Sequence, residues 1–212
     1  MFDAFHKEKL DFLDKKDKSK KGSIDKDIFE LLNKINSKKD HYTTSSCAGR
    51  IVLLEMKSSK KNECGWIFAK HDKVKFQEIY NALNKYSIKR KSKDRNNNIK
   101  KFNKIKNKKT IKNQIWFRQQ PLILHVACRN LGSARGLLNL SRRIFRRAGI
   151  IGIKYKKVTI EIIGSEHLET IVADKNFIVD KKYLKQLIKY ANENFVENKK
   201  KIGKFLKLIE KI

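Results

Sequence analysis

The sequence predicts an α/β fold in the broad sense, more narrowly α+β, in which helices flank a mixed or antiparallel sheet within one compact domain, residues 1–212. Strand-like and helix-like hydrophobic patterns follow one another in the order ββα, β, αββα, which is not the regular alternation of a doubly wound sheet. Hydrophobic residues make up 40% of the chain, enough for a sizeable core although 35% of the residues are charged. No G-x-G-x-x-G motif follows a predicted strand, so a Rossmann nucleotide site is not predicted.

Two helices are expected at the start of the chain. The first covers residues 3–15. The second follows the polar turn at 17–25, in which Ser23 can cap the helix. Its apolar residues recur at the i, i+3, i+4 and i+7 positions of one buried face: Ile28, Leu31, Leu32 and Ile35.

Two strands and a helix are expected after a loop at 37–50. The strands cover 51–56 and 65–69, and the helix shows helical spacing of Phe76, Ile79, Tyr80 and Leu83. A Lys/Asn-rich tract at 85–113 then carries 13 Lys and Arg against one acidic residue. Because this tract has few apolar residues, we expect it to be a mobile insertion.

The second half of the chain is expected to continue with strands at 115–118 and 122–128 and a helix that ends at Gly149. Four arginines near the end of this helix fall at i, i+4 spacing and would form a basic ridge: Arg142, Arg143, Arg146 and Arg147. Favourable interaction with the helix C-terminus is the alternative reason for them. A hairpin of strands at 158–163 and 168–172, followed by two helices, completes the prediction.

The charge of the chain favours a polyphosphate partner. Lys and Arg number 52 against 22 Asp and Glu, a formal net charge of +30. Such a field attracts nucleic acid and makes its binding sensitive to salt. No apolar run approaches the roughly 18 residues of a membrane helix, the N-terminus has no signal sequence, and three cysteines without a CxxC pair do not indicate a disulfide framework. We therefore expect a cytoplasmic, RNA-associated protein, with neither membrane nor DNA as partner and with its oligomeric state open.

The densest group of polar residues is HYTTSSCAGR at 41–50. Five hydroxyl or thiol side chains precede Gly49, which allows close backbone approach, and Arg50, a fixed cation. Such a segment suits a carboxylate, a phosphate or a ribose. An equally open alternative is the start of a strand whose hydroxyls bond to their own backbone.

His125 is the one imidazole within an apolar run, LILHVAC. Cys128 follows three residues later and would face the opposite side of a strand, so the two do not make a metal pair. The other candidate ligands, Cys47, Cys64 and His71, lack zinc-finger spacing, and no metal site is predicted. The alternative to a functional His125 is a buried, hydrogen-bonded one.

Several segments, taken in order, resemble one family, the wybutosine-synthesising tRNA methyltransferases that act third in that pathway. They are DKSKKGSID at 17–25, YTTSSCAGR at 42–50, PLILHVACRNL at 121–131, FRRAGI at 145–150 and ANENFVENKKKIGKF at 191–205. The match extends over nearly the whole chain outside the tract at 85–113, which replaces a short linker. Gln120 stands where an acidic residue is usual, and Ala148 where a serine is common.

The resemblance implies an S-adenosylmethionine-dependent tRNA N-methyltransferase whose fold is not that of the Rossmann methyltransferases. Its substrate would be the tricyclic 4-demethylwyosine-type base next to the anticodon of tRNA(Phe), methylated on ring nitrogen N-4, with the anticodon arm as partner. Which wyosine intermediate accepts the methyl group stays open. The alternatives are a non-catalytic basic RNA-binding protein, for which the charge would suffice, and a metal-dependent hydrolase.

The site is expected where the segment at 43–50 meets the strand of His125. We predict Ser45 and Asp25 near the transferring methyl group, with His125 orienting a group or relaying a proton. The residues predicted to bind the cofactor are Thr43, Thr44, Ser46, Cys47, Gly49 and Arg50. The basic residues predicted to contact tRNA are Lys18, Lys21, Arg129, Arg146 and Arg147.

Overall fold

The computed structural model describes residues 3–14, 25–56, 64–97, 114–155, 157–174 and 177–210. The chain forms two compact units. Unit 1 comprises Met1–Arg50, Gln120–His167 and Asn194–Ile212, and unit 2 comprises Ile51–Gln119 and Leu168–Glu193. Each unit has its own sheet and its own hydrophobic core.

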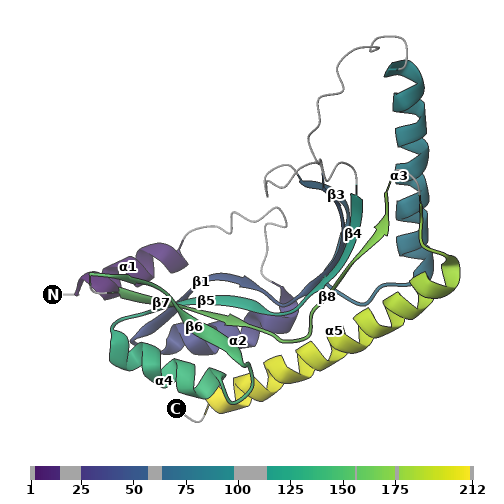
Figure 1. Ribbon diagram of the computed structural model, residues 1–212. Coiled ribbons are helices and arrows are strands. Elements are labelled where there is room, and N and C mark those ends of the chain that lie inside the picture. The colour runs from purple at the N-terminus through teal and green to yellow at the C-terminus, as the bar shows by residue number, and fades with distance from the viewer. Residues whose placement is uncertain are drawn as a thin grey trace. The chain divides into compact units, whose positions relative to one another are not determined.

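The sheet of unit 1 has four antiparallel strands in the order β1-β5-β7-β6 (Figure 1). Their bounds are His41–Cys47 for β1, Ile123–Cys128 for β5, Lys157–Ile163 for β7 and Arg147–Lys154 for β6. Strands distant in sequence are thus neighbours, and β6 lies at one edge of the sheet.

Helices cover one face of this sheet. Helix α2 (Lys26–Ser37), helix α4 (Leu131–Ser141) and the last turns of α5 (Lys181–Ile209) share one core with the strands. Its central side chains include Leu31, Leu124, Val126, Ile160, Ile162 and Phe205, all with almost no exposed area. Helix α1 (Ala4–Leu13) belongs to a smaller cluster in which Phe5 packs with Tyr42 and Ala127.

Unit 2 contains a second four-stranded sheet, in the order β3-β2-β4-β8. The strands are β2 (Arg50–Met56), β3 (Cys64–Lys70), β4 (Gln114–Gln120) and β8 (Leu168–Ala173). Helix α3 (Phe76–Asn97) and the first turns of α5 supply the helical side of its core. Ile51, Leu53, Ile79, Phe117 and Leu184 are among the buried residues.

The predicted fold class is confirmed: the chain is α+β with antiparallel sheets, and its fold is not a Rossmann fold. Helix α2 buries the four residues that its spacing indicated. Asp25, not Ser23, occupies its N-cap position, and Ser23 lies outside the described residues. Among the described helices, none has the length and apolar character of a membrane span. The grouping of residues 1–212 as one domain stays a prediction.

Several expected elements are wrong. The loop expected at 37–50 is largely strand β1, because cross-strand pairing orders its polar residues. The helix expected to end at Gly149 ends at Ser141, and Arg147 begins β6, so the arginines form no helical ridge. Strand β7 pairs with β5 and β6, and β8 pairs with β4, so no hairpin joins β7 to β8.

Two helices are longer than the sequence suggested. The two expected C-terminal helices are one helix, α5. Helix α3 continues to Asn97, so the first part of the tract at 85–113 is helical, and residues 98–113 lie outside the described part of the chain. Lys and Arg are good helix formers, which explains why the loss of apolar spacing did not end α3.

Candidate active site

Three polar residues lie in one row across the sheet of unit 1. Ser45 is opposite His125 in the β1–β5 pairing, and His125 is opposite Glu161 in the β5–β7 pairing. Directly opposed residues of antiparallel strands point to the same face. Leu124 and Val126, the neighbours of His125, are buried on the helix side, so the row lies on the other face. We call Ser45, His125 and Glu161 the polar row.

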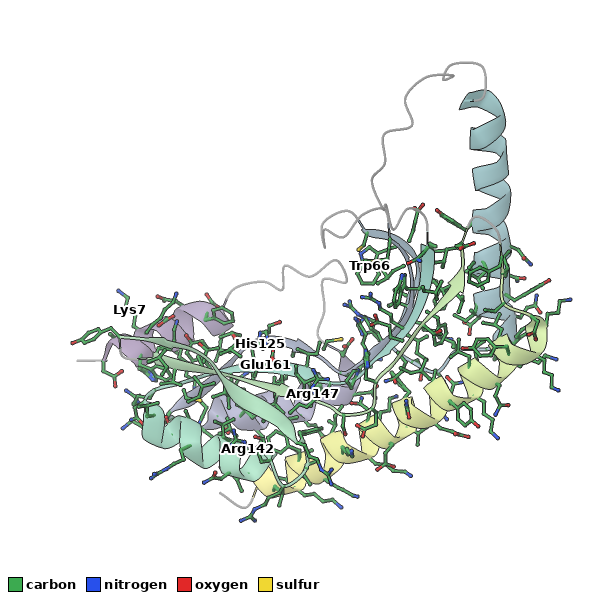
Figure 2. All side chains as sticks on the ribbon, in the orientation of Figure 1. Lys7, Trp66, His125, Arg142, Arg147 and Glu161 are labelled. Carbon is green, nitrogen blue, oxygen red and sulfur yellow. The ribbon has the colours of Figure 1, made fainter. Side chains whose placement is uncertain are left out.

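His125 and Glu161 contact each other within the polar row. The Nε2 atom of His125 lies 2.9 Å from Oε1 of Glu161, and the two side chains are 29% and 32% exposed (Figure 2). When the carboxylate accepts the Nε2 proton, the lone pair of the neutral imidazole is on Nδ1. Such an oriented imidazole can take a proton from a bound ligand.

Strand β1 divides the predicted cofactor-binding residues between two faces. Thr43 pairs with Val126, and both its amide and its hydroxyl donate to Oδ1 of Asn36 on α2, at 2.8 and 3.1 Å. Ser46 pairs with Leu124 and also faces the helix side. Thr43 and Ser46 therefore lie on the other face from the polar row, and their role in cofactor binding stays a prediction.

Ser45 and Cys47 share the face of the polar row. They lie two residues apart on β1, Ser45 exposed and Cys47 half-buried. Thr44 lies where the pairing register shifts, and its hydroxyl donates to the His125 carbonyl oxygen at 3.4 Å. The hydroxyl of Thr43 thus bonds to a side chain of α2 and that of Thr44 to the backbone of β5, whereas Ser45 is exposed to solvent.

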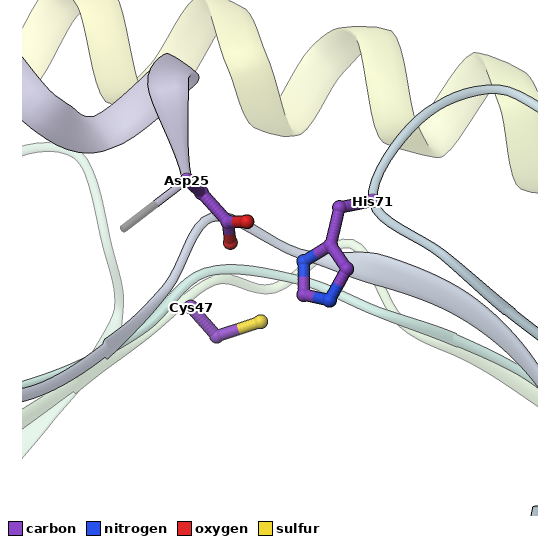
Figure 3. Close-up of side chains that lie close together, drawn as sticks. All are labelled: Asp25, Cys47 and His71. Carbon is purple, nitrogen blue, oxygen red and sulfur yellow. The ribbon is translucent and has the colours of Figure 1, made fainter. Parts of the chain in front are cut away.

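Asp25 adds a carboxylate at the end of β1. It is only 8% exposed, and its Oδ2 accepts a hydrogen bond from the Ala48 amide at 3.0 Å. A carboxylate oxygen of Asp25 lies within 4.8 Å of the Cys47 sulfur (Figure 3). The structure thus brings Asp25 beside Cys47, which shares its face with Ser45.

Protein atoms fill the space next to the turn that follows β1. Gly49 has a φ of 111°, and a Cβ there would lie 2.9 Å from the Gln120 carbonyl oxygen and 3.0 Å from Nδ2 of Asn198. The packing of this turn therefore requires a glycine at position 49, and the role of Gly49 in cofactor binding stays a prediction. Arg50 donates from Nε to Oε1 of Gln120 at 2.6 Å, so part of its guanidinium is bound within unit 1.

Arg129 is held by contacts within the protein, and its role in binding tRNA stays a prediction. Its guanidinium donates to Asp3 and Asp40 and lies 4.8 Å from the centre of the Phe5 ring. The contacts with Asp3 and Phe5 fasten the start of α1 to the sheet. An arginine committed to two carboxylates offers little charge to a phosphate.

Arg146 and Arg147 are exposed, whereas Lys18 and Lys21 lie outside the described residues. Arg147 pairs with Ile163, two residues from the pairing of Gly149 with Glu161. Residues two apart on a strand point the same way, so Arg147 lies on the face of the polar row. The guanidinium of Arg147 therefore adds a positive charge to the face of the polar row (Figure 2).

Comparison with protein families identifies the group to which this chain belongs. The family model described as Methyltransferase TYW3 matches residues 6–211. The chain is a member of the TYW3 family. It is therefore an enzyme that transfers a methyl group from a donor.

Members of the TYW3 family resemble the chain over almost its whole length. A protein of Archaeoglobus fulgidus, named tRNA(Phe) 7-((3-amino-3-carboxypropyl)-4-demethylwyosine(37)-N(4))-methyltransferase, is 32% identical, with 100% of this chain and 95% of the relative covered. A tRNA wybutosine-synthesizing protein 3 homolog of Danio rerio is 30% identical, covering 98% and 75%. The solved structure of PH1069 from Pyrococcus horikoshii has a TM-score of 0.76 at 29% identity, covering 97% of this chain and 94% of that one.

Sequence reasoning missed two residues of this candidate site. Glu161 is the charged residue of the alternating strand VTIEII, and such a residue between apolar neighbours on both sides was the available signal. Asn198 is fully buried on α5, donates to the Ala48 carbonyl at 2.7 Å and accepts from the Leu122 amide at 2.8 Å. Its two hydrogen bonds hold the end of β1 against the start of β5, which fixes the strands that carry Ser45 and His125.

Proposed function

We propose that this chain transfers a methyl group from S-adenosylmethionine to ring nitrogen N-4 of 7-(3-amino-3-carboxypropyl)-4-demethylwyosine in tRNA(Phe), within wybutosine biosynthesis. The names of full-length relatives from Archaeoglobus fulgidus and Thermococcus sibiricus support this acceptor. The observation that carries the proposal is the polar row, because removing the proton of a ring nitrogen requires a basic group next to an open surface.

The residues on this face suit a sulfonium donor. S-adenosylmethionine, when bound, supplies an electrophilic methyl group on a positively charged sulfur. Asp25 and Glu161 are carboxylates, and Ser45 and Cys47 are small polar neighbours on the same side of β1. Carboxylates favour a nearby cation, so this set fits the donor. Ser45, Cys47 and Asp25 would line its binding site.

The chain's own chemistry centres on His125. Its imidazole accepts the proton that the ring nitrogen loses, and Glu161 holds the tautomer and stabilises the charge that His125 gains. Ser45 hydrogen-bonds to a polar edge of the base and so fixes its approach, since positioning supplies much of the acceleration in a two-substrate transfer. Arg147 binds a phosphate of the anticodon arm beside this face.

Labelled methyl transfer tests the proposal. The protein is incubated with methyl-labelled S-adenosylmethionine and tRNA(Phe) that lacks the N-4 methyl group, with and without the aminocarboxypropyl side chain on the base. We expect label on the tRNA that carries the side chain. The charge of +30 by itself predicts only binding of both tRNAs without label. Binding without label would overturn the proposal.

A further inference from the structure

A groove runs along α4 on the helix side of the unit 1 sheet. Its volume is about 540 Å³, and it is lined by Leu131, Gly132, Arg135, Leu138, Asn139, Arg142 and Ile150. Ile150 pairs with the buried core residue Ile160, whereas Gly149, next to it, pairs with Glu161. The groove therefore lies on the face opposite the polar row and is separate from the candidate active site.

Strand β6 forms one wall of this groove and is an exposed apolar edge. It is the last strand of its sheet, and Ile150, Ile151 and Ile153 are 43%, 52% and 65% exposed. Ile153 pairs with the buried Val158, so it points to the helix side as Ile150 does. Edge strands are usually short, charged or covered, because an open apolar edge recruits another strand.

The outer edge of β6 presents its backbone to this groove. Arg142 donates from Nε and from its terminal nitrogen to the Ala148 carbonyl oxygen, at 3.2 and 3.0 Å. That carbonyl therefore points away from β7. Backbone groups of residues two apart leave a strand on the same side, so the amide and carbonyl of Ile150 also point outward.

We propose that β6 and the α4 groove bind an extended acidic segment of a partner protein, which adds to the sheet as a fifth strand. Its backbone pairs with the outer edge of β6, and every second side chain, which is apolar, enters the groove against Leu138 and Ile150. Acidic side chains of the segment meet Arg135 and Arg142.

Charge and chemistry disfavour two other occupants. A second copy of the chain would bring another β6 antiparallel to this one, with Arg147 near Lys154 of the copy, and each chain carries a net charge of +30. RNA binds through stacking on aromatic rings as well as through cations. The side chains that line the groove within the described residues are aliphatic, arginine or asparagine.

Fluorescence anisotropy with a labelled peptide tests the proposal. The peptide has eight residues, the length of β6, with glutamate and leucine alternating, and is measured at about 0.15 M salt so that unspecific attraction is screened. The control peptide has the same sequence with N-methyl groups on alternate amides. We expect at least about tenfold weaker binding of the N-methylated peptide, since each missing backbone hydrogen bond costs about 1 kcal/mol.

Matched protein variants locate the binding site. R135Q should weaken binding of the alternating peptide about threefold or more. R143Q removes another exposed charge, outside the groove, and should leave the affinity unchanged. Both variants should keep the thermal midpoint of the native chain, because both arginines are exposed.

Three results would overturn the proposal. Equal binding of the N-methylated peptide would show that backbone pairing with β6 contributes nothing and that only charge attracts the peptide. Displacement of the peptide by single-stranded polyuridylate, with R135Q lowering RNA affinity as much as peptide affinity, would assign the groove to RNA. Concentration-dependent dimers that I153N abolishes would assign it to a second copy. None of these measurements uses methyl transfer, so the outcome is independent of the proposed reaction.

Discussion

A single imidazole on an apolar strand becomes a useful base only when a neighbour sets its tautomer, and Glu161 does this for His125. The same row carries Ser45 at the exposed end, where a ligand can reach it. Two other predicted residues, Thr43 and Gly49, are used by the fold itself. Residue type alone did not separate Ser45 from Thr43, because both are small residues with a hydroxyl group.

Substitutions in the polar row should lower turnover without changing the fold. We expect H125A to reduce the methylation rate about 10²-fold or more and E161Q to reduce it less, since general-base assistance contributes about 10²–10⁴-fold. S45A should lower the rate with little effect on tRNA affinity. T159A, on the same face of β7, is the control and should leave the rate unchanged. Full turnover of H125A in a single-turnover assay would remove His125 from the mechanism.

Glycine positions should differ in their tolerance of a methyl group. G49A should lower the free energy of unfolding by about 1–3 kcal/mol, because φ is 111° and the new Cβ would lie 2.9 Å from the Gln120 carbonyl oxygen. G136A on α4 has nothing within 4 Å of the new Cβ and should stabilise by about 0.5–1 kcal/mol. Urea unfolding measures both. Equal stability of G49A and the native chain would mean that the turn rearranges at no cost.

Among the elements, α1 depends most clearly on ion pairs for its place on the sheet. Asp3 contacts Arg129, and Glu8 contacts Lys157 on β7. The backbone amide of His6 and the Arg129 guanidinium lower the pKa of Asp3, and the hydrogen bond from Lys157 lowers the pKa of Glu8. The charged carboxylates therefore favour the docked helix.

Helix α1 should loosen selectively in acid. A carboxyl group whose pKa is lower in the folded state stabilises that state at every pH above its ordinary value of about 4, and this stabilisation is lost as the pH falls through the lowered pKa. We expect the hydrogen-exchange protection factors of α1 amides to fall below about pH 4 while those of α4 persist. An E8Q variant should show a smaller change with pH. Parallel loss in both helices would indicate global unfolding instead.

Element boundaries also explain where sequence reasoning failed. Strand β1 has no alternation of apolar and polar residues, and β6 contains two glycines, which are depleted in strands. Both are strands because a neighbour pairs with them. By contrast, α2 has a helical apolar stripe that needs no distant partner to be recognised, and its four buried residues were predicted correctly. The apolar stripe of α2 can be recognised within twelve consecutive residues, whereas strand pairing depends on segments far apart in the sequence.

Across the whole molecule, the net charge of +30 makes association with tRNA a counterion-release process. Residues 98–113 contribute seven lysines and no acidic residue to that charge. Lysines spread along a chain contact phosphates and not base edges. They should therefore add affinity without adding selectivity among tRNAs.

Deletion of residues 98–113 should flatten the salt dependence of tRNA binding. The slope of log affinity against log salt should become shallower by about 0.7–0.9 for each phosphate that the shortened protein no longer neutralises, while the preference for tRNA(Phe) is kept. Filter binding at several salt concentrations, with another elongator tRNA as comparison, measures both quantities. Loss of the preference on deletion would show that this tract recognises the substrate directly.

The sequence by itself determined the fold class, the family resemblance and the apolar cores. Composition, the order of motifs and hydrophobic periodicity can all be obtained from the sequence without knowing which segments pair. It also pointed to Ser45 and His125 as residues of one site. Only the tertiary structure decided that Glu161 completes their row and that Thr43 and Ser46 turn away from it. The physical reason is register: a shift of one residue in strand pairing moves a side chain to the opposite face, and pairing between distant segments is set by the packed sheet.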